Sequence, residues 1–295
     1  MTAPLWTCDD LLAGCGGALF DPAFGCGPIS GIEIDSRNCK SGDLFVALVG
    51  DMQDGHDFIT KAAEAGAAAC LVRRPNSDAA IAQIIVDDPL GALARLGRTS
   101  RSRFAGKMVG ITGSVGKTGS KDMLAHALTA FGKTHASQRS FNNHIGVPIT
   151  LATLAADCDF AVQEMGMNAA GEIAALTALA RPDIALITRI DSTHGGFFDS
   201  LDDIAKAKAE IFEGLNAGGT AILNIDDPFY GQLVSAATKA DAARIISFGR
   251  KTDAEFCLLE AHQHKEGMTV HAEIARRELR FEMQMHGIHW AQNAL

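Results

Sequence analysis

The hydrophobic and polar positions of this chain predict a small α/β region over residues 1–105. Four short apolar runs bounded by Gly, Pro, Asn or Asp predict buried strands, namely GIEID, GDLFVALVG, AAACLV and AIAQIIVDD. Between them, DFITKAAEAGA and PLGALARLGRTSRSRF carry apolar residues at helical spacing. Strands that alternate with helices are typical of an α/β domain, whose end we place near residues 103–107.

Beyond that boundary the alternation of strands and helices becomes more regular. Helical segments separate the strand runs KMVGIT, DFAVQEM, DIALITRI, TAILNID and ARIISFG, which predicts a doubly wound, mostly parallel sheet. After Gly249, the runs FCLLEA, MTVHAEI and LRFEMQM follow one another without helices and predict an antiparallel extension. We therefore expect domains at 1–105 and 106–295, the second incomplete because its last residues, HGIHWAQNAL, are typical of a helix start.

The composition narrows the possible partners and location. A net charge of −9 without any Lys/Arg run disfavours nucleic acid or an anionic membrane as the main partner. The seven cysteines form no CxxC pair, which is typical of reduced thiols rather than of a zinc ribbon or a redox motif. Two aspartates interrupt the N-terminal segment where a signal peptide needs apolar residues, and no window approaches the ~18 apolar residues of a membrane span. We expect a cytoplasmic protein.

One glycine-rich segment has the context of a phosphate-binding loop. The run GSVGKT follows a predicted strand and precedes a helical segment. Backbone N–H groups at the helix start would hold phosphate oxygens, Lys117 would reach the β- and γ-phosphates, and Thr118 would bind Mg²⁺. Five residues rather than the usual four separate Gly110 from Gly116, so a turn without a ligand remains the alternative. The predicted nucleotide-binding residues of this loop are Gly113, Ser114, Val115, Gly116, Lys117 and Thr118.

Polar residues also follow three predicted parallel strands, where ligands of open α/β sheets bind. Glu164 ends one strand run, His194 comes after the next, and Asp226 follows a third. These groups could complete a metal shell around nucleotide phosphates, although each alone could equally be an ion-pair partner, a helix-start residue or an N-cap. On the helix after His194, Lys206 and Lys208 occupy different faces, so only one can face this site, and a solvated surface lysine is the alternative.

Taken together, these motifs resemble the Mur ligase family. The similar runs are GITGSVGKTGSKDML, FNNHIGVPITL, EMGMNAAGEIAAL, RPDIALIT, AKAEIFEGL and LNIDDP. The N-terminal run DSRNCKSGDLFVALVGDMQDGHDFITKAAEAGAAACLV resembles the first domain of the dipeptide-adding members, so the resemblance covers nearly the whole chain. It implies a UDP-sugar-binding domain at 1–105, a central ATP-binding domain at 106–295, and the absence of the family's third, ATP-closing domain, with little turnover as the consequence.

The resemblance also implies a reaction and its partners. ATP would phosphorylate the terminal carboxylate of UDP-N-acetylmuramoyl-tripeptide, and the amine of D-alanyl-D-alanine would attack the acyl phosphate to form an amide in peptidoglycan precursor synthesis. Catalysis of such a reaction would depend mainly on positioning and charge neutralisation. The resemblance also implies two Mg²⁺ ions and a monomeric protein. The third residue of the peptide, diaminopimelate or lysine, stays open.

Residue roles follow from the same motifs. Lys117 matches the residue that holds the γ-phosphate, while Thr118 and Glu164 match ligands of a first Mg²⁺. His194 and Lys208 match ligands of a second ion, with Lys208 as a carbamate, which would turn a cation into a metal-bridging anion. The implied catalytic residues are therefore Lys117, His194 and Lys208.

Substrate contacts are implied at both ends of the chain. Asn293 matches an adenine-contacting asparagine in the pattern G-x-H-x-x-x-N. Arg37 suits the diphosphate of a uridine nucleotide, with an ion pair inside its own domain as the alternative. The substrate-binding residues implied by the resemblance are Ser36, Arg37, Asn142, Asn143 and His144.

One departure and several alternatives remain. Where many relatives have Asn after the third strand, this chain has Arg189, to which we assign no role. Another ligase of the superfamily is possible, such as the diamino-acid-adding muramyl ligase or a folylpolyglutamate synthase, but the FNNHIGVP run and the first domain favour the dipeptide-adding type. An unrelated P-loop kinase or NTPase would not need the EMGMN run. The last alternative is a fragment that binds nucleotide and UDP-sugar without catalysis.

Overall fold

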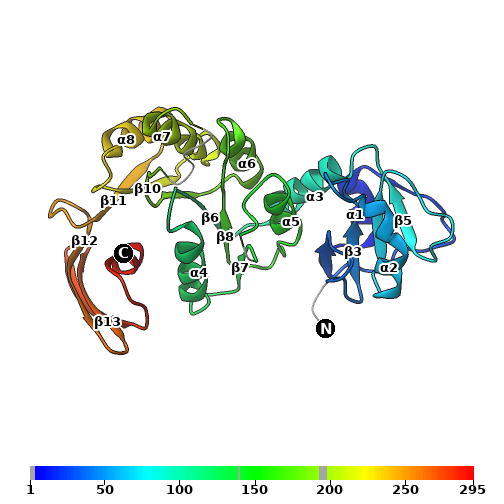
Figure 1. Cartoon of the computed structure of the whole chain (residues 1–295), viewed down its shortest axis with the longest axis horizontal. Helices are drawn as coiled ribbons and strands as arrows, with labels where there is room; N and C mark the ends of the chain where they lie inside the picture. Colours follow the sequence, from blue (N-terminus) through cyan, green and yellow to red (C-terminus); the bar gives the residue numbers. More distant parts are fainter. Residues whose placement is uncertain (1–3, 139, 193–197) are drawn as a thin grey trace. The chain divides into compact units, whose positions relative to one another are not determined.

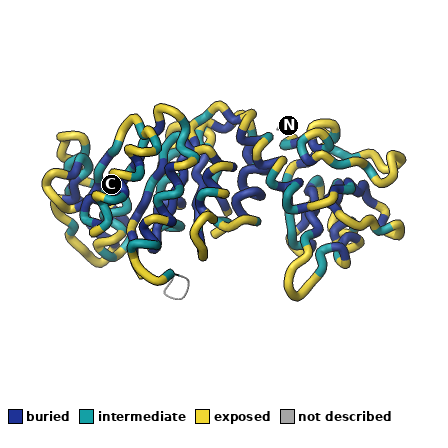
Figure 2. Tube along the Cα trace, turned by 90° about the horizontal axis from the view of Figure 1, so that it is seen from above, coloured by how far each residue is buried: buried dark blue, intermediate teal, exposed yellow. Residues whose placement is uncertain are grey.

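The computed structural model describes residues 4–138, 140–192 and 198–295, and the chain divides into two compact units (Figure 1). Unit 1 comprises Met1–Ala105 and Pro148–Asp157, and unit 2 comprises Gly106–Val147 and Cys158–Leu295. In each unit the buried residues concentrate along the strands and the exposed ones in the connecting loops (Figure 2).

Unit 1 is built around a five-stranded sheet of order β1-β5-β4-β3-β2. The neighbouring strands from β5 to β2 are parallel, and only β1 pairs antiparallel. Its elements are α1 (Cys8–Cys15), β1 (Ala18–Leu19), β2 (Gly31–Glu33), β3 (Asp43–Val46), η1 (Gly55–Phe58), α2 (Ile59–Glu64), β4 (Ala69–Val72), β5 (Ala82–Ile85) and α3 (Pro89–Arg103).

Local sequence chemistry explains these elements. Every position of β3 and β4 is buried, as expected of central strands covered on both faces. On one face, Phe45 and Val72 pack with Ile59 of α2. The side chain of Thr7 caps α1, and that of Asp88 caps α3.

A short segment that the sequence placed in the second region lies in unit 1 instead. Residues Pro148–Asp157 cluster with unit 1. Leu151 lies against α3 at Gly97, where an added Cβ would come within 3.2 Å of Leu151 Cβ, and the indole Nε1 of Trp6 donates to the carbonyl of Ala152 at 2.9 Å. Sequence periodicity could not find this return of the chain because it depends on packing between distant residues.

Unit 2 contains a nine-stranded sheet of order β14-β13-β12-β11-β10-β9-β6-β8-β7. The strands from β7 to β12 are parallel, and β12, β13 and β14 continue as an antiparallel extension. The strands are β6 (Lys107–Thr112), β7 (Thr134–Ala136), β8 (Phe160–Glu164), β9 (Ile184–Ile187), β10 (Thr220–Asn224), β11 (Arg244–Gly249), β12 (Phe256–His264), β13 (Gly267–Ile274) and β14 (Arg277–Met283).

Helices cover both faces of the parallel part of this sheet. Figure 1 shows α4 on one side and α6, α7 and α8 on the other. The helical elements of unit 2 are α4 (Lys117–Leu128), α6 (Glu172–Ala180), α7 (Leu201–Ala209), η2 (Glu210–Gly214), α8 (Tyr230–Lys239) and α9 (Ile288–Asn293). Most of α5 (Gly146–Ala152) belongs to the segment that lies in unit 1. The predicted fold class, an α/β region followed by a doubly wound, mostly parallel sheet with an antiparallel extension, is confirmed.

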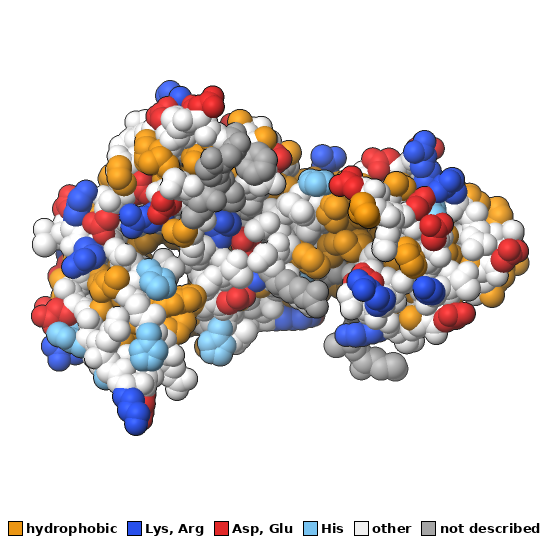
Figure 3. Space-filling view, in the orientation of Figure 1, with side chains coloured by type: hydrophobic (Ala, Val, Ile, Leu, Met, Phe, Trp, Pro, Cys, Tyr) orange, Lys and Arg blue, Asp and Glu red, His pale blue; other side chains and the backbone are white. Residues whose placement is uncertain are grey.

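The antiparallel extension has one apolar and one polar face. Met268, Val270 and Met283 are buried against Trp290 of α9. On the opposite face, His262 and His264 are exposed and lie 3.0 Å from Glu260 Oε2 and 2.9 Å from Glu282 Oε2. Imidazoles accordingly appear on the surface of this part of unit 2 (Figure 3).

No membrane-crossing helix exists within the described ranges, since none of their helices is both long and apolar enough.

We predict that Trp6→Phe destabilises unit 1. The variant leaves the buried Ala152 carbonyl without its indole donor, which should cost about 1–3 kcal/mol in the free energy of unfolding. Urea unfolding followed by far-UV circular dichroism measures the change. Phe131→Leu, at a side chain that is 79% exposed, is the control and should change stability by less than about 0.5 kcal/mol. Equal effects of the two variants would contradict the prediction.

Candidate active site

The GSVGKT segment forms a tight turn between β6 and α4. Gly113 has φ 147° and lies so close to the end of β9 that a Cβ there would collide with Thr188 Oγ1. The Thr188 hydroxyl donates to the Val115 carbonyl at 2.6 Å and so holds the turn against β9. Gly116, at φ 86°, is the N-cap of α4 and makes no side-chain capping bond, which leaves the first N–H groups of the helix available to an anion.

Lys117 and Thr118 begin α4 beside this turn. The Lys117 Nζ donates to the carbonyls of Gly113 at 2.8 Å and Ser114 at 3.3 Å, so the ammonium lies over the turn. Burial lowers the pKa of Lys117, and the Glu164 carboxylate partly opposes this shift. The Thr118 hydroxyl lies 3.5 Å from Ser140 Oγ. This is the arrangement of a loop that can bind a phosphate chain.

Glu164 lies at the carboxyl end of β8, next to β6. It is fully buried, and its Oε1 accepts from Asn142 Nδ2 at 2.7 Å. Its Oε2 is also buried, and no other described residue hydrogen-bonds to it. A buried carboxylate oxygen that lacks a partner is costly unless a cation or a proton donor completes its surroundings.

The two lysines of α7 have opposite environments, which resolves the alternative that the sequence left open. Lys206 is exposed and pairs with Asp202 at 2.5 Å. Lys208 is fully buried, and its Nζ has no hydrogen-bond partner among the residues that the structure describes. Burial, with the Lys117 charge as a smaller cause, lowers the pKa of Lys208 to about 7. Since Lys208 interacts with Lys117, and Lys117 with Glu164, the three charged groups belong to one site.

This site has the donors that a Mg²⁺ ion bound with phosphates would use. Hard oxygen ligands suit Mg²⁺, and Thr118 supplies a hydroxyl while Glu164 supplies the carboxylate oxygen that lacks a partner. Across the described ranges, no cluster of three or more His, Cys, Asp or Glu side chains could hold a metal by itself. A metal here would therefore depend on phosphate or other added oxygens, and His194, the remaining predicted ligand, lies outside the described residues.

Asn293 lies against the GSVGKT turn. A Cβ at Gly116 would come within 2.9 Å of Asn293 Nδ2, and Trp290 packs on α4 at Gly119. The adjacent Gln292 donates from Nε2 to Asp226 Oδ2 at 3.2 Å, which fixes this end of α9. The structure thus brings Asn293 to the turn that the sequence predicted to bind the same nucleotide.

The aspartates that follow another strand, Asp226 and Asp227, accept hydrogen bonds from backbone amides. Asp226 Oδ2 accepts from the amide of Arg250 at 2.6 Å, and Asp227 Oδ2 accepts from the amide of Ile190 at 2.7 Å. Asp226 is thus hydrogen-bonded inside the fold, and its part in a metal shell stays a prediction. Arg189, to which no role was assigned, has a half-exposed side chain with Nε 3.9 Å from Asp191 Oδ2.

The residues expected to contact the uridine-peptide substrate have mixed environments. Ser36 is buried. The Arg37 side chain is 85% exposed and bonds Asp35, with Nη2 2.6 Å from Oδ2, so the ion pair inside its own domain is present. Asn143 Oδ1 caps α5 by accepting from the amide of Gly146 at 2.9 Å, and His144 is exposed. The Arg37 guanidinium is open to solvent, whereas the Asp35 side chain is 33% exposed.

Two contacts of the site were missed by sequence reasoning. The Asn142–Glu164 bond joins residues 22 positions apart, and Ser140 lies beside Thr118. Lys121, three residues after Thr118 and so on the same face of α4, is almost fully buried. That spacing from Thr118 was the only sequence signal that could have indicated it.

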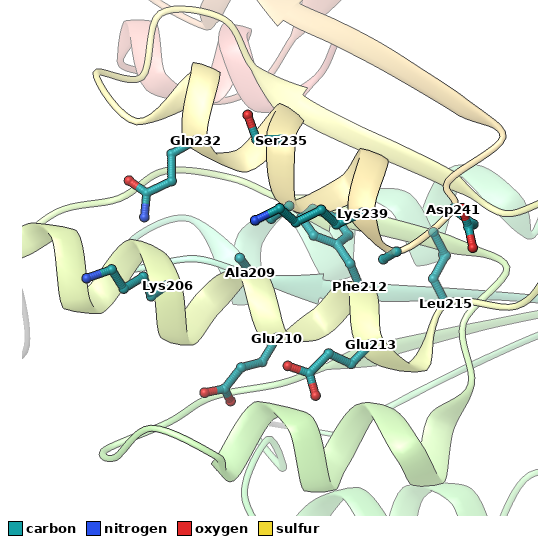
Figure 4. Close-up of a pocket in the computed structure, with 12 residues that line it drawn as sticks. Lys206, Ala209, Glu210, Phe212, Glu213, Leu215, Gln232, Ser235, Lys239 and Asp241 are labelled. Carbon is teal, nitrogen blue, oxygen red and sulfur yellow. The ribbon is translucent and has the colours of Figure 1, made fainter.

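A separate hollow of about 740 Å³ lies between α7–η2 and α8. Figure 4 shows Lys206, Glu210 and Lys239 around it. Lys206 pairs with Asp202, and Glu210 accepts from the amides of Gly171 and Ala174. Because Lys206 and Glu210 already have partners inside the fold, the hollow is a weaker candidate site than the GSVGKT turn.

Comparison with known proteins links both units to one family. Residues 111–295 match the family described as Mur ligase middle domain, and residues 28–101 match that described as Mur ligase family, catalytic domain. The UDP-N-acetylmuramoyl-tripeptide–D-alanyl-D-alanine ligase of Bacillus subtilis is 37% identical over 281 residues, which is 95% of this chain and 60% of that protein. The chain thus spans well under two thirds of that relative's length.

Solved structures agree with the sequence comparison. A crystal structure of MurF from Acinetobacter baumannii has a TM-score of 0.85 and 32% identity, covering 98% of this chain and 62% of that one. The MurF ligase of Thermotoga maritima in complex with ADP has a TM-score of 0.73 and 25% identity, covering 89% of this chain and 61% of that one.

We predict that Lys208→Met stabilises the protein, and more at pH 6.5 than at pH 9.5. The pKa of Lys208 falls from its usual 10.5 to about 7 on folding, so between these values the unfolded chain holds a proton that the folded chain has lost. The free energy of unfolding of the wild type therefore rises with pH across that window, and the cost of the buried amine is largest below it.

Thermal unfolding in buffer freed of CO₂ and of metal ions measures this change in stability. The expected gain from Lys208→Met at pH 6.5 is about 1–4 kcal/mol, shrinking toward pH 9.5. Lys206→Met, on the exposed face of the same helix, is the matched control and should change little at either pH. A gain that does not depend on pH would show that Lys208 titrates normally.

Proposed function

The chain belongs to the Mur ligase family, and on that premise we propose that it binds ATP and UDP-N-acetylmuramoyl-tripeptide and takes part in adding D-alanyl-D-alanine to that peptide. One observation carries the proposal: a phosphate-binding turn, a buried carboxylate at Glu164 and a buried amine at Lys208 converge at one edge of the parallel sheet. The likeness to dipeptide-adding ligases over 95% of the chain supports the choice of substrate.

The first chemical step is phosphoryl transfer. A carboxylate oxygen of the tripeptide attacks the γ-phosphorus of ATP, the bond to the β-γ bridging oxygen breaks, and ADP leaves. The turn amides and Lys117 hold the phosphates, so their charges are neutralised in a fixed geometry rather than by mobile water. The low pKa of Lys117 reflects its partial burial, and a phosphate beside it would favour the protonated form.

The second step forms the amide. The amine of D-alanyl-D-alanine attacks the carbonyl carbon of the acyl phosphate, a tetrahedral intermediate forms, and inorganic phosphate leaves while the nitrogen loses a proton. In this proposal the N–H groups at the start of α4 hold the phosphate while it leaves. Asn293, which lies against Gly116, contacts the adenine end of the nucleotide.

Mg²⁺, when bound, supplies positive charge that offsets the phosphate charges. Thr118 and Glu164 would hold a first ion, and Lys208 as a carbamate, together with His194, would hold a second. The neutral amine of Lys208 can attack CO₂, which forms an N–C bond and releases a proton. Its burial without a partner in the described ranges, beside Lys117, favours an anion at this position.

Unit 1 is proposed to hold the uridine-nucleotide end of the substrate. Ser36 and Arg37 follow β2 at the carboxyl edge of its sheet, where ligands of parallel sheets bind. Asn142, Asn143 and His144 are proposed to face the muramoyl-peptide. Among the described residues the catalytic groups all lie in unit 2, so binding of the uridine end can be tested separately from turnover. We also propose a cytoplasmic, monomeric protein.

Three other functions can be separated from this one by experiment. A diamino-acid-adding relative would prefer a UDP-linked dipeptide, and a folylpolyglutamate synthase would prefer a folate. A non-catalytic fragment would bind both nucleotides but form no amide. Proteins named MurF at TM-scores up to 0.85 favour the dipeptide-adding reaction.

We predict that calorimetric titration shows UDP-N-acetylmuramoyl-tripeptide binding clearly more tightly than UDP, and a folate not at all. Arg37→Ala should weaken the tripeptide nucleotide about tenfold, since a charge-assisted bond to the diphosphate is lost. Arg98→Ala, an exposed arginine on α3, is the control and should leave affinity unchanged. If ATP bound but neither uridine ligand did, the proposed substrate would be wrong and a P-loop nucleotide binder would remain.

We further predict that incubation with ¹³C-bicarbonate gives one carbamate signal in the ¹³C NMR spectrum of the wild type. Lys208→Met should abolish it, because the reacting amine is removed, whereas Lys206→Met should retain it. A missing signal in the wild type, or one that persists in Lys208→Met, would remove the carbamate from the mechanism.

A further inference from the structure

We propose that Lys121 is a positioning residue, which anchors the chain after β7 to α4 and thereby holds Ser140 and Asn142 at the metal-binding side of the site. Its Nζ donates to the Ser137 carbonyl at 2.8 Å, just beyond the end of β7. Lys121 lies one helical turn after Thr118, on the same face of α4. The inference rests on the proposed nucleotide-binding function and goes beyond it.

The burial of Lys121 is what needs an explanation. Its side chain is only 2% exposed, although an ammonium in a protein interior costs several kcal/mol unless it is bonded. Its carboxylate neighbour, Asp122 Oδ1 at 2.9 Å, belongs to a side chain that is 67% exposed, so most of that charge is already solvated. The Ser137 carbonyl is a contact that ties the ammonium to another part of the fold.

Ser140 and Asn142, which follow Ser137 in the sequence, both contact residues of the site. Ser140 Oγ lies 3.5 Å from the Thr118 hydroxyl, and Asn142 Nδ2 donates to Glu164 Oε1 at 2.7 Å. The Asn142 carbonyl also accepts from the amide of Gly166 at 2.8 Å, just after Glu164. Thr118 and Glu164, the two oxygen donors proposed for the first Mg²⁺, are thus both supported by the chain that Lys121 fixes.

The contacts that hold the proposed metal-binding side of the site differ from those that hold the phosphate-binding turn. The turn is held by the Thr188 bond to the Val115 carbonyl and by the contact between Gly113 and β9, in which Lys121 takes no part. In the sheet order, β8 and β7 lie on the far side of β6 from β9, and α4 packs against β7 and β8. Figure 1 shows α4 near β7. Loss of the Lys121 anchor should therefore disturb Mg²⁺-dependent binding of a nucleotide more than binding of the nucleotide itself.

The test compares ADP affinity with and without Mg²⁺, by calorimetry on the 295-residue chain. Lys121→Met, which keeps the length and apolar stem, should weaken ADP binding about tenfold in Mg²⁺ and less than twofold in EDTA. Lys121→Gln, which keeps an N–H donor for the Ser137 carbonyl, should recover part of the loss and replaces the Met variant if that one does not fold. Lys107→Met, an exposed lysine at the start of β6, is the control.

A double-mutant cycle tests whether Lys121 acts through Asn142. If Lys121 acts through Asn142, then Lys121→Met combined with Asn142→Ala should bind Mg²⁺-ADP no more weakly than the weaker single variant. Hydrogen exchange should also rise in the peptide that contains β7 in Lys121→Met, but not across α8.

Three results would overturn the inference: unchanged Mg²⁺-ADP affinity in Lys121→Met, an equal loss in EDTA, or independent losses in the cycle. If the wild type itself bound no ADP, the proposed function would fail first and this inference with it. The wild-type titration therefore distinguishes the two failures.

Discussion

The burial of Glu164 and Lys208 at one edge of the parallel sheet is the constraint on which the candidate site depends. Both side chains are fully buried, and the Glu164 Oε2 and Lys208 Nζ atoms have no hydrogen-bond partner in the parts of the chain that are described. Such groups are costly without a ligand, and the shift of the Lys208 pKa to about 7 expresses that cost. In the proposed function, binding of phosphates and metal ions offsets this cost.

Neutral side chains around the candidate site hold its turn and its charged groups in fixed positions. Thr188 fixes the phosphate-binding turn to β9, while Asn142 fixes Glu164. Gln292, bonded to Asp226, fixes the end of α9 beside the turn. Each of these is a neutral group bonded to backbone or to one charged partner, so the charged groups themselves stay available to ligands. Preorganisation of this kind is how an enzyme of phosphoryl transfer obtains most of its effect.

Substrate recognition and chemistry are assigned to different units. The residues proposed for the uridine nucleotide follow β2 of unit 1, whereas the phosphate-binding turn follows β6 of unit 2. Both families matched by the chain are Mur ligase families, and the Bacillus subtilis relative extends well beyond the aligned part. The two proposed binding functions can be measured on this chain separately from the proposed ligase activity.

Much of the architecture follows from sequence alone, because strand and helix periodicity and the GSVGKT run are local signals. They predicted the α/β fold class and the turn at residues 113–118, while the family was implied by the resemblance of several runs taken together. The fold class and the family are confirmed. Only the tertiary structure decided that Lys208 rather than Lys206 is buried, that Asp226 serves the backbone, and that Pro148–Asp157 returns to unit 1. Those outcomes depend on which side chains lose water when distant segments pack, and neither spacing nor composition records that.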